Sequence, residues 1–478
     1  MRYLKALFVL ALGLAIAAPA YAETQNVKVS GSIDAYWFYR HNLDLTDNND
    51  TGSVANGFAV PGTDHAGSAQ HRSESDDFAM TITQLQVNAD LTDNVSTVVN
   101  LINQRDWNAN AYEGNAANAA NEFDVLLDLA YVQMKEIFYA PLTLTVGRQD
   151  LVFGRGFILG WNPQNPGING TGAAGTGTIS ATEFTQIQSF DALRATLDFN
   201  PWTIDMVYSN VDENSRDNAD DRELYLVNVN YKFAEYNAVA EAYYLGDFDK
   251  AAVAGATGTK DNTTHTWGGR LQFDPISQIT LGGEIAYQNG DYFALVGSPA
   301  RDRSAWALDL FGEYRFDNQW KPMAGIEYVY FSGEEDMGTG STQGYGSWNG
   351  SWRLPVYGWL RDYQGIYYAT GQTTDQPAGT NQEHISLYGT LNPLADLKLA
   401  ANYWHFWAPE SVHVTPGALG SSTLGKQIGD EIDTTVTYSY TEDVTFTFYA
   451  NWFFPGSMYN SPNDSTATEY ISEVKVVF

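Results

Sequence analysis

Hydrophobic and polar residues alternate along most of the chain, as in antiparallel strands that have two unlike faces. Between residues 431 and 440, one face carries Ile432, Val436 and Tyr438, whereas the other carries Asp433, Thr435 and Thr437. The next alternating segment begins at Val444 after a connection of only three residues. A period of two on both sides of so short a connection predicts a β-hairpin.

The same alternation recurs at residues 85–91, 202–208, 279–287 and 308–316. About 18 such segments fit along the chain, each near the roughly 9–11 residues that a tilted strand needs to cross a bilayer. Short connections, such as Asn200-Pro201, alternate with long polar segments rich in glycine. We therefore predict an all-β fold, a transmembrane antiparallel β-barrel with short periplasmic turns and long extracellular loops. Alternation alone would also fit a soluble sandwich or solenoid.

Both ends of the sequence agree with export to an outer membrane. Arg2 and Lys5 precede an apolar stretch that ends in Ala20-Tyr21-Ala22, which predicts a signal peptide at residues 1–22. That stretch is too short to span a membrane as a helix. The last segment is an amphipathic strand ending at Phe478, and it resembles the terminal strand that the barrel-assembly machinery reads in Gram-negative bacteria. We expect residues 23–478 to form a single barrel domain in the outer membrane, with the lipid bilayer and that machinery as partners.

Composition and charge narrow the possible functions. The chain has no cysteine, so a closed strand ladder, and not disulfides, is expected to supply its stability. Its 25 Lys and Arg stand against 57 Asp and Glu, a formal net charge of −32. This balance excludes nucleic acid as a partner. Acidic loops would instead attract divalent cations at the outer rim.

Motifs for covalent chemistry are absent. There is no Gly-x-Ser-x-Gly sequence, and the seven histidines are scattered. We expect no enzyme, although a hydrolase with Ser or Asp beside His on adjacent strands near the outer rim is an alternative. An oxygen-rich cluster could hold Ca²⁺, but it lacks the glycine and glutamate of an EF-hand, which favours a solvated turn. The cluster consists of Asp44, Asp47, Asn48, Asn49 and Asp50. We predict no cofactor, and keep a calcium-binding surface barrel with a closed lumen as a second alternative.

Charged residues within the strands lie mostly opposite the apolar faces, which assigns them to the lumen. Salt bridging among themselves is the simpler role for each. In a barrel of 16–18 strands, however, side chains cannot fill the interior, so the same charges would line an aqueous passage. The predicted pore-lining residues are Arg148, Arg194, Asp198, Arg270, Asp309, Glu313, Arg315 and Asp433. The loop at 334–381 contains three tryptophans, and we expect it to fold into the pore.

One stretch of the sequence resembles a known family. Residues 147–154 (Gly-Arg-Gln-Asp-Leu-Val-Phe-Gly), 160–162 (Gly-Trp-Asn) and 189–194 (Ser-Phe-Asp-Ala-Leu-Arg) resemble the alginate-export family of outer-membrane barrels, and residues 130–132 (Ala-Tyr-Val) fit as well. The resemblance implies an 18-stranded barrel that exports a polyuronate through a lumen lined with arginines, and it would give a pore role to Arg148 and Arg194. Simple alternation places Arg148 with Leu144 and Val146, so its pore role requires a β-bulge or a position beyond the lipid band.

These observations together predict an outer-membrane porin or channel. It would pass a small hydrophilic solute or a polysaccharide by diffusion or export. A channel for a polyanion should be rich in Lys and Arg, but this chain contains few of either. Family members with unrelated substrates therefore remain an alternative.

Overall fold

The computed structural model describes most of the chain between Asn26 and Phe478. The described residues are 26–42, 45, 75–107, 125–139, 141–162, 185–213, 221–250, 262–292, 301–334, 346–360, 380–411, 413–414, 422–423, 425–459 and 465–478. The predicted signal peptide and the five oxygen-rich residues between Asp44 and Asp50 lie outside this part. No helix in the described part is long and apolar enough to cross a membrane.

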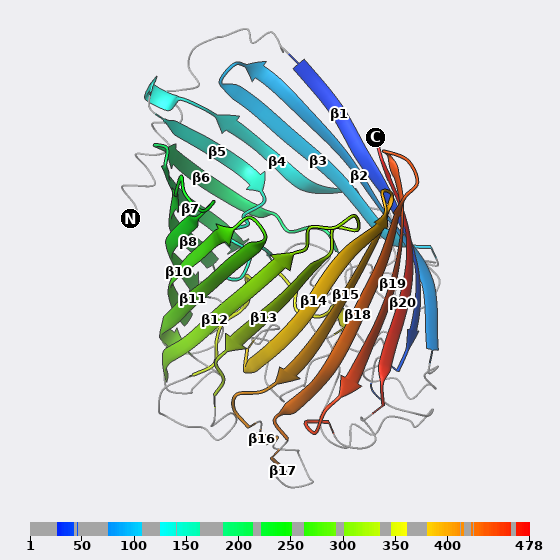
Figure 1. The fold of residues 1–478 in the computed structure, drawn as a ribbon. Helices are drawn as coiled ribbons and strands as arrows, with labels where there is room; N and C mark the ends of the chain where they lie inside the picture. The colour runs from blue at the N-terminus through cyan, green and yellow to red at the C-terminus, as the bar shows by residue number, and fades with distance from the viewer. Residues whose placement is uncertain are drawn as a thin grey trace, which may run out of the picture.

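Eighteen antiparallel strands form one closed sheet, which confirms the predicted barrel and its strand number (Figure 1). The strands are β1 (Asn26–His41), β2 (Ser75–Thr92), β3 (Val95–Asp106), β4 (Leu126–Met134), β5 (Leu142–Gln149), β6 (Phe190–Asp198), β7 (Trp202–Glu213), β8 (Asp221–Lys232), β9 (Val239–Asp249), β10 (Asn262–Ile276), β11 (Ile279–Tyr292), β12 (Arg301–Arg315), β13 (Met323–Phe331), β14 (Gln382–Leu394), β15 (Leu397–Trp407), β18 (Gln427–Ser439), β19 (Val444–Pro455) and β20 (Ala467–Val477). A short ladder of β16 (His413–Val414) and β17 (Ser422–Thr423) stands apart, and η2 (Ile137–Tyr139) is a single 3₁₀ turn.

The barrel closes where β1 pairs with β20. Tyr36 lies opposite Glu473 in this ladder. The amide of Gly31 donates to the Phe478 carbonyl at 2.8 Å, and the Phe478 amide donates back at 3.0 Å. A side chain at Gly31 would meet the Phe478 ring, so glycine lets the last residue pack against the first strand. Each of the strands in this closed sheet therefore pairs with a neighbour on both sides.

The two ends of the barrel differ as the sequence predicted. Short turns lie at one end, toward the top of Figure 1, and the segments between strand pairs that are long in sequence leave from the other end. The predicted hairpin is present, because Thr437 of β18 pairs with Thr447 of β19. By analogy with bacterial barrels, the short turns mark the periplasmic side and the long connections the extracellular side.

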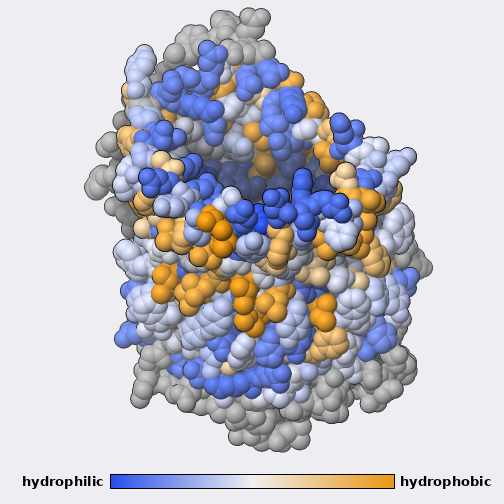
Figure 2. All heavy atoms as spheres, in the orientation of Figure 1, coloured by the Kyte–Doolittle hydropathy of each residue, from blue (hydrophilic) through white to orange (hydrophobic). Residues whose placement is uncertain are grey.

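The outer surface is apolar and the inner surface is mainly polar. Ile432, Val436 and Tyr438, which the alternation placed on one face, are exposed large hydrophobic residues. Figure 2 shows a belt of apolar side chains around this face of the molecule and, above it, a hollow lined by hydrophilic side chains. An apolar outer belt around a polar interior is the arrangement that a bilayer requires of a barrel.

Toward the extracellular side, the inner face of the barrel is apolar as well. Phe331, Trp404 and Phe406 point inward there and are buried. They pack against two segments that fold into the barrel, residues 150–162 and residues 346–360, here called the first and second inner segments. Burial of this apolar surface, at about 25 cal/mol per Å², holds both segments against the wall.

Candidate functional site

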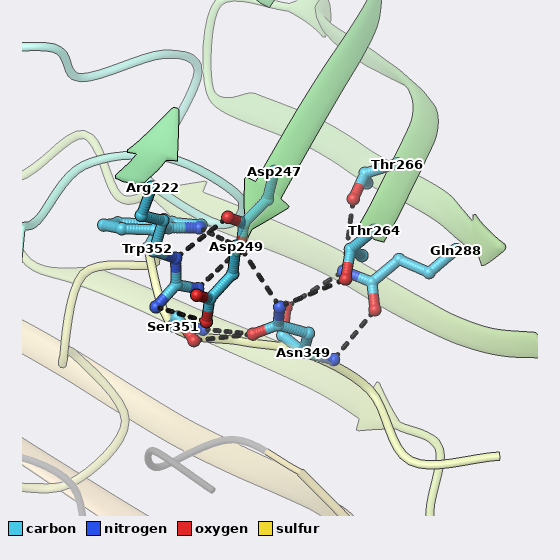
Figure 3. A network of polar contacts seen from close by, with 9 residues as sticks. All are labelled: Arg222, Asp247, Asp249, Thr264, Thr266, Gln288, Asn349, Ser351 and Trp352. Carbon is cyan, nitrogen blue, oxygen red and sulfur yellow. Dashed lines mark hydrogen bonds and ion pairs between the residues drawn. The ribbon is translucent and has the colours of Figure 1, made fainter. Parts of the chain in front are cut away.

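The second inner segment begins at the wall formed by β8 to β11, where Trp352 is its main anchor (Figure 3). The indole nitrogen of Trp352 donates to Asp247 Oδ2 at 3.0 Å. The Arg222 guanidinium lies 4.5 Å from the centre of the indole ring and forms two hydrogen bonds to Asp247, at 2.9 and 2.6 Å. A cation–π contact and a bidentate ion pair therefore share one buried position.

Asn349 fixes the backbone of the same segment a few residues earlier. Its amide donates to Gln288 Oε1 at 2.8 Å, while Gln288 Nε2 donates to the Asn349 carbonyl at 2.9 Å (Figure 3). Asn349 Nδ2 also reaches Asp247 Oδ2 at 3.3 Å. The segment thus completes buried hydrogen bonds of three neighbouring strands, β9 to β11.

At its other end, the second inner segment reaches β18 and β20. The Trp359 amide donates to Asp433 Oδ2 at 3.1 Å, and its indole nitrogen donates to Glu469. The Leu360 amide donates to Glu431 Oε1 at 2.6 Å. Since its two ends bind β9–β11 and β18–β20, the segment crosses the interior of the barrel.

The first inner segment is held by Arg155. Its guanidinium contacts Asp309 Oδ2 of β12 at 2.9 Å and Glu327 Oε1 of β13 at 2.7 Å. It also lies 4.1 Å from the ring centre of Phe311. Burial disfavours the charge on Arg155, but the carboxylates of Glu327 and Asp309 outweigh this effect and raise its pKa. Arg155 therefore stays charged and binds this segment to the charged inner face of β9 to β13, here called the charged wall.

The two inner segments bind each other. The Leu354 amide donates to the Gly156 carbonyl at 2.9 Å, and the amides of Gly160 and Trp161 donate to the Trp352 carbonyl at 2.8 and 3.0 Å. Gly156 has φ +75°, and a Cβ there would collide with Leu354. Glycine is required because other residues rarely adopt this conformation and because the chains approach so closely. The two segments together form a constriction inside the barrel.

The segment at residues 185–189, which leads into β6, lies against β1 to β4. Ser189 Oγ donates to Asp128 Oδ1 at 3.3 Å, and the Gln186 amide donates to Gln104 Oε1 at 2.7 Å. Ile187 is buried in a cluster that includes Phe38 and Met80. The segment is therefore held by an apolar cluster, by side-chain amides and by the carboxylate of Asp128.

Seven of the eight predicted pore-lining residues share the inner face by strand register. Arg194 pairs with Asp205 at 2.9 Å and lies 5.1 Å from the ring centre of Phe153, in the first inner segment. Asp198 lies on the same face at the end of β6, where its Oδ1 accepts from the Asn200 amide at 3.1 Å. The other five contact partners on the inner face or in an inner segment. These contacts are Arg270 with Glu241 at 2.6 Å, Asp309 with Arg155, Arg315 with Glu313 at 3.0 Å, and Asp433 with Trp359.

Arg148 was assigned to the lumen incorrectly. Its register partner is Asp191, which faces the same way as Leu193 and away from Arg194. Arg148 Nη1 donates to Asp191 Oδ2 at 3.0 Å, and the Asp191 side chain is two-thirds exposed. No bulge interrupts the β5–β6 ladder between them, so the alternation that placed Arg148 outside holds.

Sequence reasoning missed Arg155, although it follows directly on the family-like stretch. The available signal for a buried segment here was the apolar run Phe157-Ile158-Leu159, which lies outside the alternating segments. The expectation that residues 334–381 enter the pore is confirmed for the described residues 346–360. A second signal was available for segments that fold into the barrel. Near the extracellular end of a strand, apolar side chains occur on both faces, as in Trp404-His405-Phe406-Trp407.

A pair of the kind needed for a hydrolase does occur, on the outer face. His405 Nδ1 lies 2.7 Å from Asp430 Oδ1 on the adjacent strand, and the Tyr403 hydroxyl donates to the same oxygen at 2.6 Å. No serine contacts this pair among the described residues. The described residues also contain no group of three or more carboxylate or histidine side chains placed to hold a metal.

Several solved structures have the same fold, and one of them, OpdK, is an outer-membrane protein. OccAB1 from Acinetobacter baumannii aligns with a TM-score of 0.54 at 11% identity, covering 97% of this chain and 99% of that one. OccK2 (OpdF) from Pseudomonas aeruginosa in complex with glucuronate gives 0.52 at 10% identity, covering 95% and 98%. OpdK from the same organism gives 0.51 at 10% identity, covering 95% and 99%. At these identities the likeness establishes the fold alone. No curated protein matches the sequence significantly.

The sequence profile of a family described as alginate export matches residues 63–472, which is most of the chain. The closed barrel with its apolar belt places the protein in the outer membrane of a Gram-negative bacterium, as a channel of the porin type. The chain belongs to the alginate export family.

Proposed function

We propose that the channel favours anionic hydrophilic solutes, such as sugar acids or an acidic polysaccharide, and that they pass by diffusion. The observation that carries this proposal is the relative exposure of the two partners in ion pairs on the inner face. In four ion pairs of the inner face, the cation is clearly more exposed than its carboxylate.

Four ion pairs show this difference most clearly. Relative exposure of the cationic and acidic side chains is 35% and 2% for Arg155–Asp309, 30% and 7% for Arg194–Asp205, 49% and 22% for Arg315–Glu313, and 41% and 0% for Lys475–Asp34. The pairs come from the constriction, the middle of β6 and the ends of β12 and β20 near the short turns. A solute moving between the constriction and the periplasm would meet the cations first.

The acidic net charge of the chain does not oppose this proposal. At physiological ionic strength, charges more than about 8–10 Å apart are largely screened, so acids on the outer loops act weakly inside the barrel. Buried carboxylates instead hold the guanidinium groups in place, as planar ion pairs do. Arg148 is excluded from this set, and the pore-lining role of the other seven residues is part of the proposal.

The experiment that tests the proposal is the reversal potential of the purified protein in a planar bilayer under a salt gradient, with glucuronate or a polyuronate added to one side. We expect anion preference and a current reduced by the acidic saccharide. Arg194→Glu should shift the preference toward cations, whereas the matched variant Arg148→Glu, which changes an outward arginine, should leave it unchanged. Cation preference in the wild-type protein would overturn the proposal.

We also propose that the protein performs no covalent chemistry and that the barrel-assembly machinery inserts it through β20. The first part is supported by the surroundings of His405, whose contact to Asp430 is shared with Tyr403 and faces outward. Loss of insertion when Phe478 is replaced by Ser, together with normal export across the inner membrane, would support the second part. Normal insertion of that variant would contradict it.

A further inference from the structure

A row of primary amides follows β2 along the inner face, on the side opposite the charged wall in the sheet order. Gln86 Nε2 donates to Asn88 Oδ1 at 3.0 Å, and Gln84 Nε2 donates to Gln186 Oε1 at 2.8 Å. Gln186 in turn is bound to Gln104. Alternate residues on a strand face are about 7 Å apart, so the row extends from near the short turns to the constriction. We call these five residues the amide row.

The amide row keeps hydrogen-bonding groups open to the lumen. Each primary amide offers two donors and two acceptor positions. In the described part of the chain, the Oε1 atoms of Gln84 and Gln86 accept no hydrogen bond, and Asn88 Nδ2 donates none. None of these three atoms belongs to a buried, unsatisfied group, and all three side chains are at least partly exposed. They can therefore bind a solute without breaking an existing contact.

Aromatic side chains stand beside the constriction end of the row. Trp359 and Tyr449 stack with ring centres 5.4 Å apart and planes inclined by 23°. The hydroxyls of Tyr449 and Tyr36 donate to the two oxygens of Glu473, at 2.8 and 3.3 Å. Gln186 Nε2 lies 3.5 Å from the Tyr36 hydroxyl, which joins the aromatic group to the amide row. All three rings are half-buried, so part of each faces the lumen.

From this placement we infer that the inner face of β1, β2 and β20 is a binding track for the hydroxyl groups and ring faces of a saccharide. An amide can donate to one hydroxyl and accept from its neighbour, and vicinal hydroxyls of a sugar ring present that pattern. Aromatic rings offer a flat apolar surface to the C–H face of the sugar. Sites that bind small polar ligands combine such surfaces with a few placed polar groups.

The amides and rings of the track recognise a different part of the solute from the cations of the four ion pairs, one of which, Lys475–Asp34, joins β20 and β1. All five residues of the amide row are neutral. A cation, Lys28, is adjacent as the register partner of Asn88, at the end of the row near the short turns. Affinity for a neutral oligosaccharide would therefore come from the amides and rings, whereas anion preference would come from the ion pairs. The inference rests on the proposed function only in requiring an open channel.

The test is the concentration dependence of current block by maltotetraose, a neutral oligosaccharide, in the purified full-length protein. We expect block of the wild-type protein, and Gln84→Leu with Gln86→Leu should weaken it by about tenfold, the effect of losing two ordinary hydrogen bonds. The matched control is Gln133→Leu, which removes an inward amide of β4 outside the row. Its block should equal that of the wild type.

The outcomes separate this inference from the proposed function. Block that is unchanged in the double variant, or no block of a conducting, anion-preferring channel, would overturn the saccharide track and leave the proposed function standing. Anion preference that persists in the double variant while maltotetraose block falls supports both, and also shows that the variant is folded. Maltotetraose block in a channel that prefers cations would support the track and overturn the proposed function.

Discussion

The charged wall and the amide row lie on the same inner surface, but they hold different chain segments and by different means: the charged wall holds the first inner segment, and the amide row holds residues 185–189. On β9 to β13, Arg155 contacts buried carboxylates, and removal of either partner leaves a charge without compensation. On β1 to β3, residues 185–189 are held by Ile187 in an apolar cluster and by neutral amides. The charged wall should therefore fix its segment strongly, and the amide side should tolerate substitution better.

This difference shows that polarity alone does not describe a lumen. Both faces satisfy the rule that polar residues lie opposite the apolar belt. Only the identity of the polar groups distinguishes a surface that binds by charge from one that binds by neutral hydrogen bonds. The following changes test the contrast, beginning with the largest expected effect.

Arg155→Ala should have the largest effect. It leaves Asp309 and Glu327 buried without their cation, and we expect the packing of the first inner segment to weaken by about 3 kcal/mol, at the lower end for a buried pair because the guanidinium is a third exposed. Single-channel conductance should rise and fluctuate. Adding Asp309→Asn and Glu327→Gln should restore part of the packing, and no difference between the single and triple variants would contradict an electrostatic role.

Ile187→Ala tests the amide side. Removing this buried side chain should cost about 2 kcal/mol locally, the low end for such a truncation, because neighbouring side chains can close part of the cavity. Hydrogen exchange of residues 185–189 should become faster while ion preference stays the same. A rise in single-channel conductance as large as that of Arg155→Ala would show that the two sides are not independent.

Gly156→Ala tests the contact between the inner segments. A left-handed backbone conformation at a residue with a Cβ costs about 1–2 kcal/mol, and the methyl group would displace Leu354. We expect altered conductance with an unchanged barrel, measured in a planar bilayer and by circular dichroism. Gly312→Ala, at a strand glycine with ordinary φ, serves as the control.

Asp150→Asn should have the smallest effect, visible as a change in pH dependence. Burial and, to a smaller extent, the carboxylate of Asp128 raise the pKa of Asp150 to about 6, while Arg148 opposes the rise. A raised pKa means that the contribution of the protonated acid to stability is complete below its ordinary pKa and is lost as pH rises through about 6. Exchange of the backbone amides at 150–162 should therefore be slower at pH 5 than at pH 7.5 beyond the intrinsic rate difference, and the Asp150→Asn variant should lack that difference.

The barrel was predictable because lipid imposes a simple rule. A strand exposed to lipid must show apolar residues at every second position, so Ile432, Val436 and Tyr438 could be placed on the outer face from sequence alone. The same rule placed seven charged residues on the inner face. It also predicted the outward position of Arg148, and the error arose when family resemblance was given more weight than the alternation.

The constriction was harder to predict because its contacts join distant parts of the chain. Arg155 meets Asp309 across 154 residues, and Trp352 meets Asp247 across 105. Alternation describes one strand at a time and carries no information about which segment fills the interior. Inward apolar residues at the strand ends, such as Phe331 and Phe406, indicated that something covers them but not what.

The seam between β1 and β20 has a consequence for the timing of assembly. Tyr36 and Glu473 are 437 residues apart, so this ladder is the last that can form while the chain grows from its N-terminus. Until then both seam strands expose unpaired backbone groups, which aggregate readily. Docking of β20 against both β1 and β19 therefore removes the two open edges in a single step.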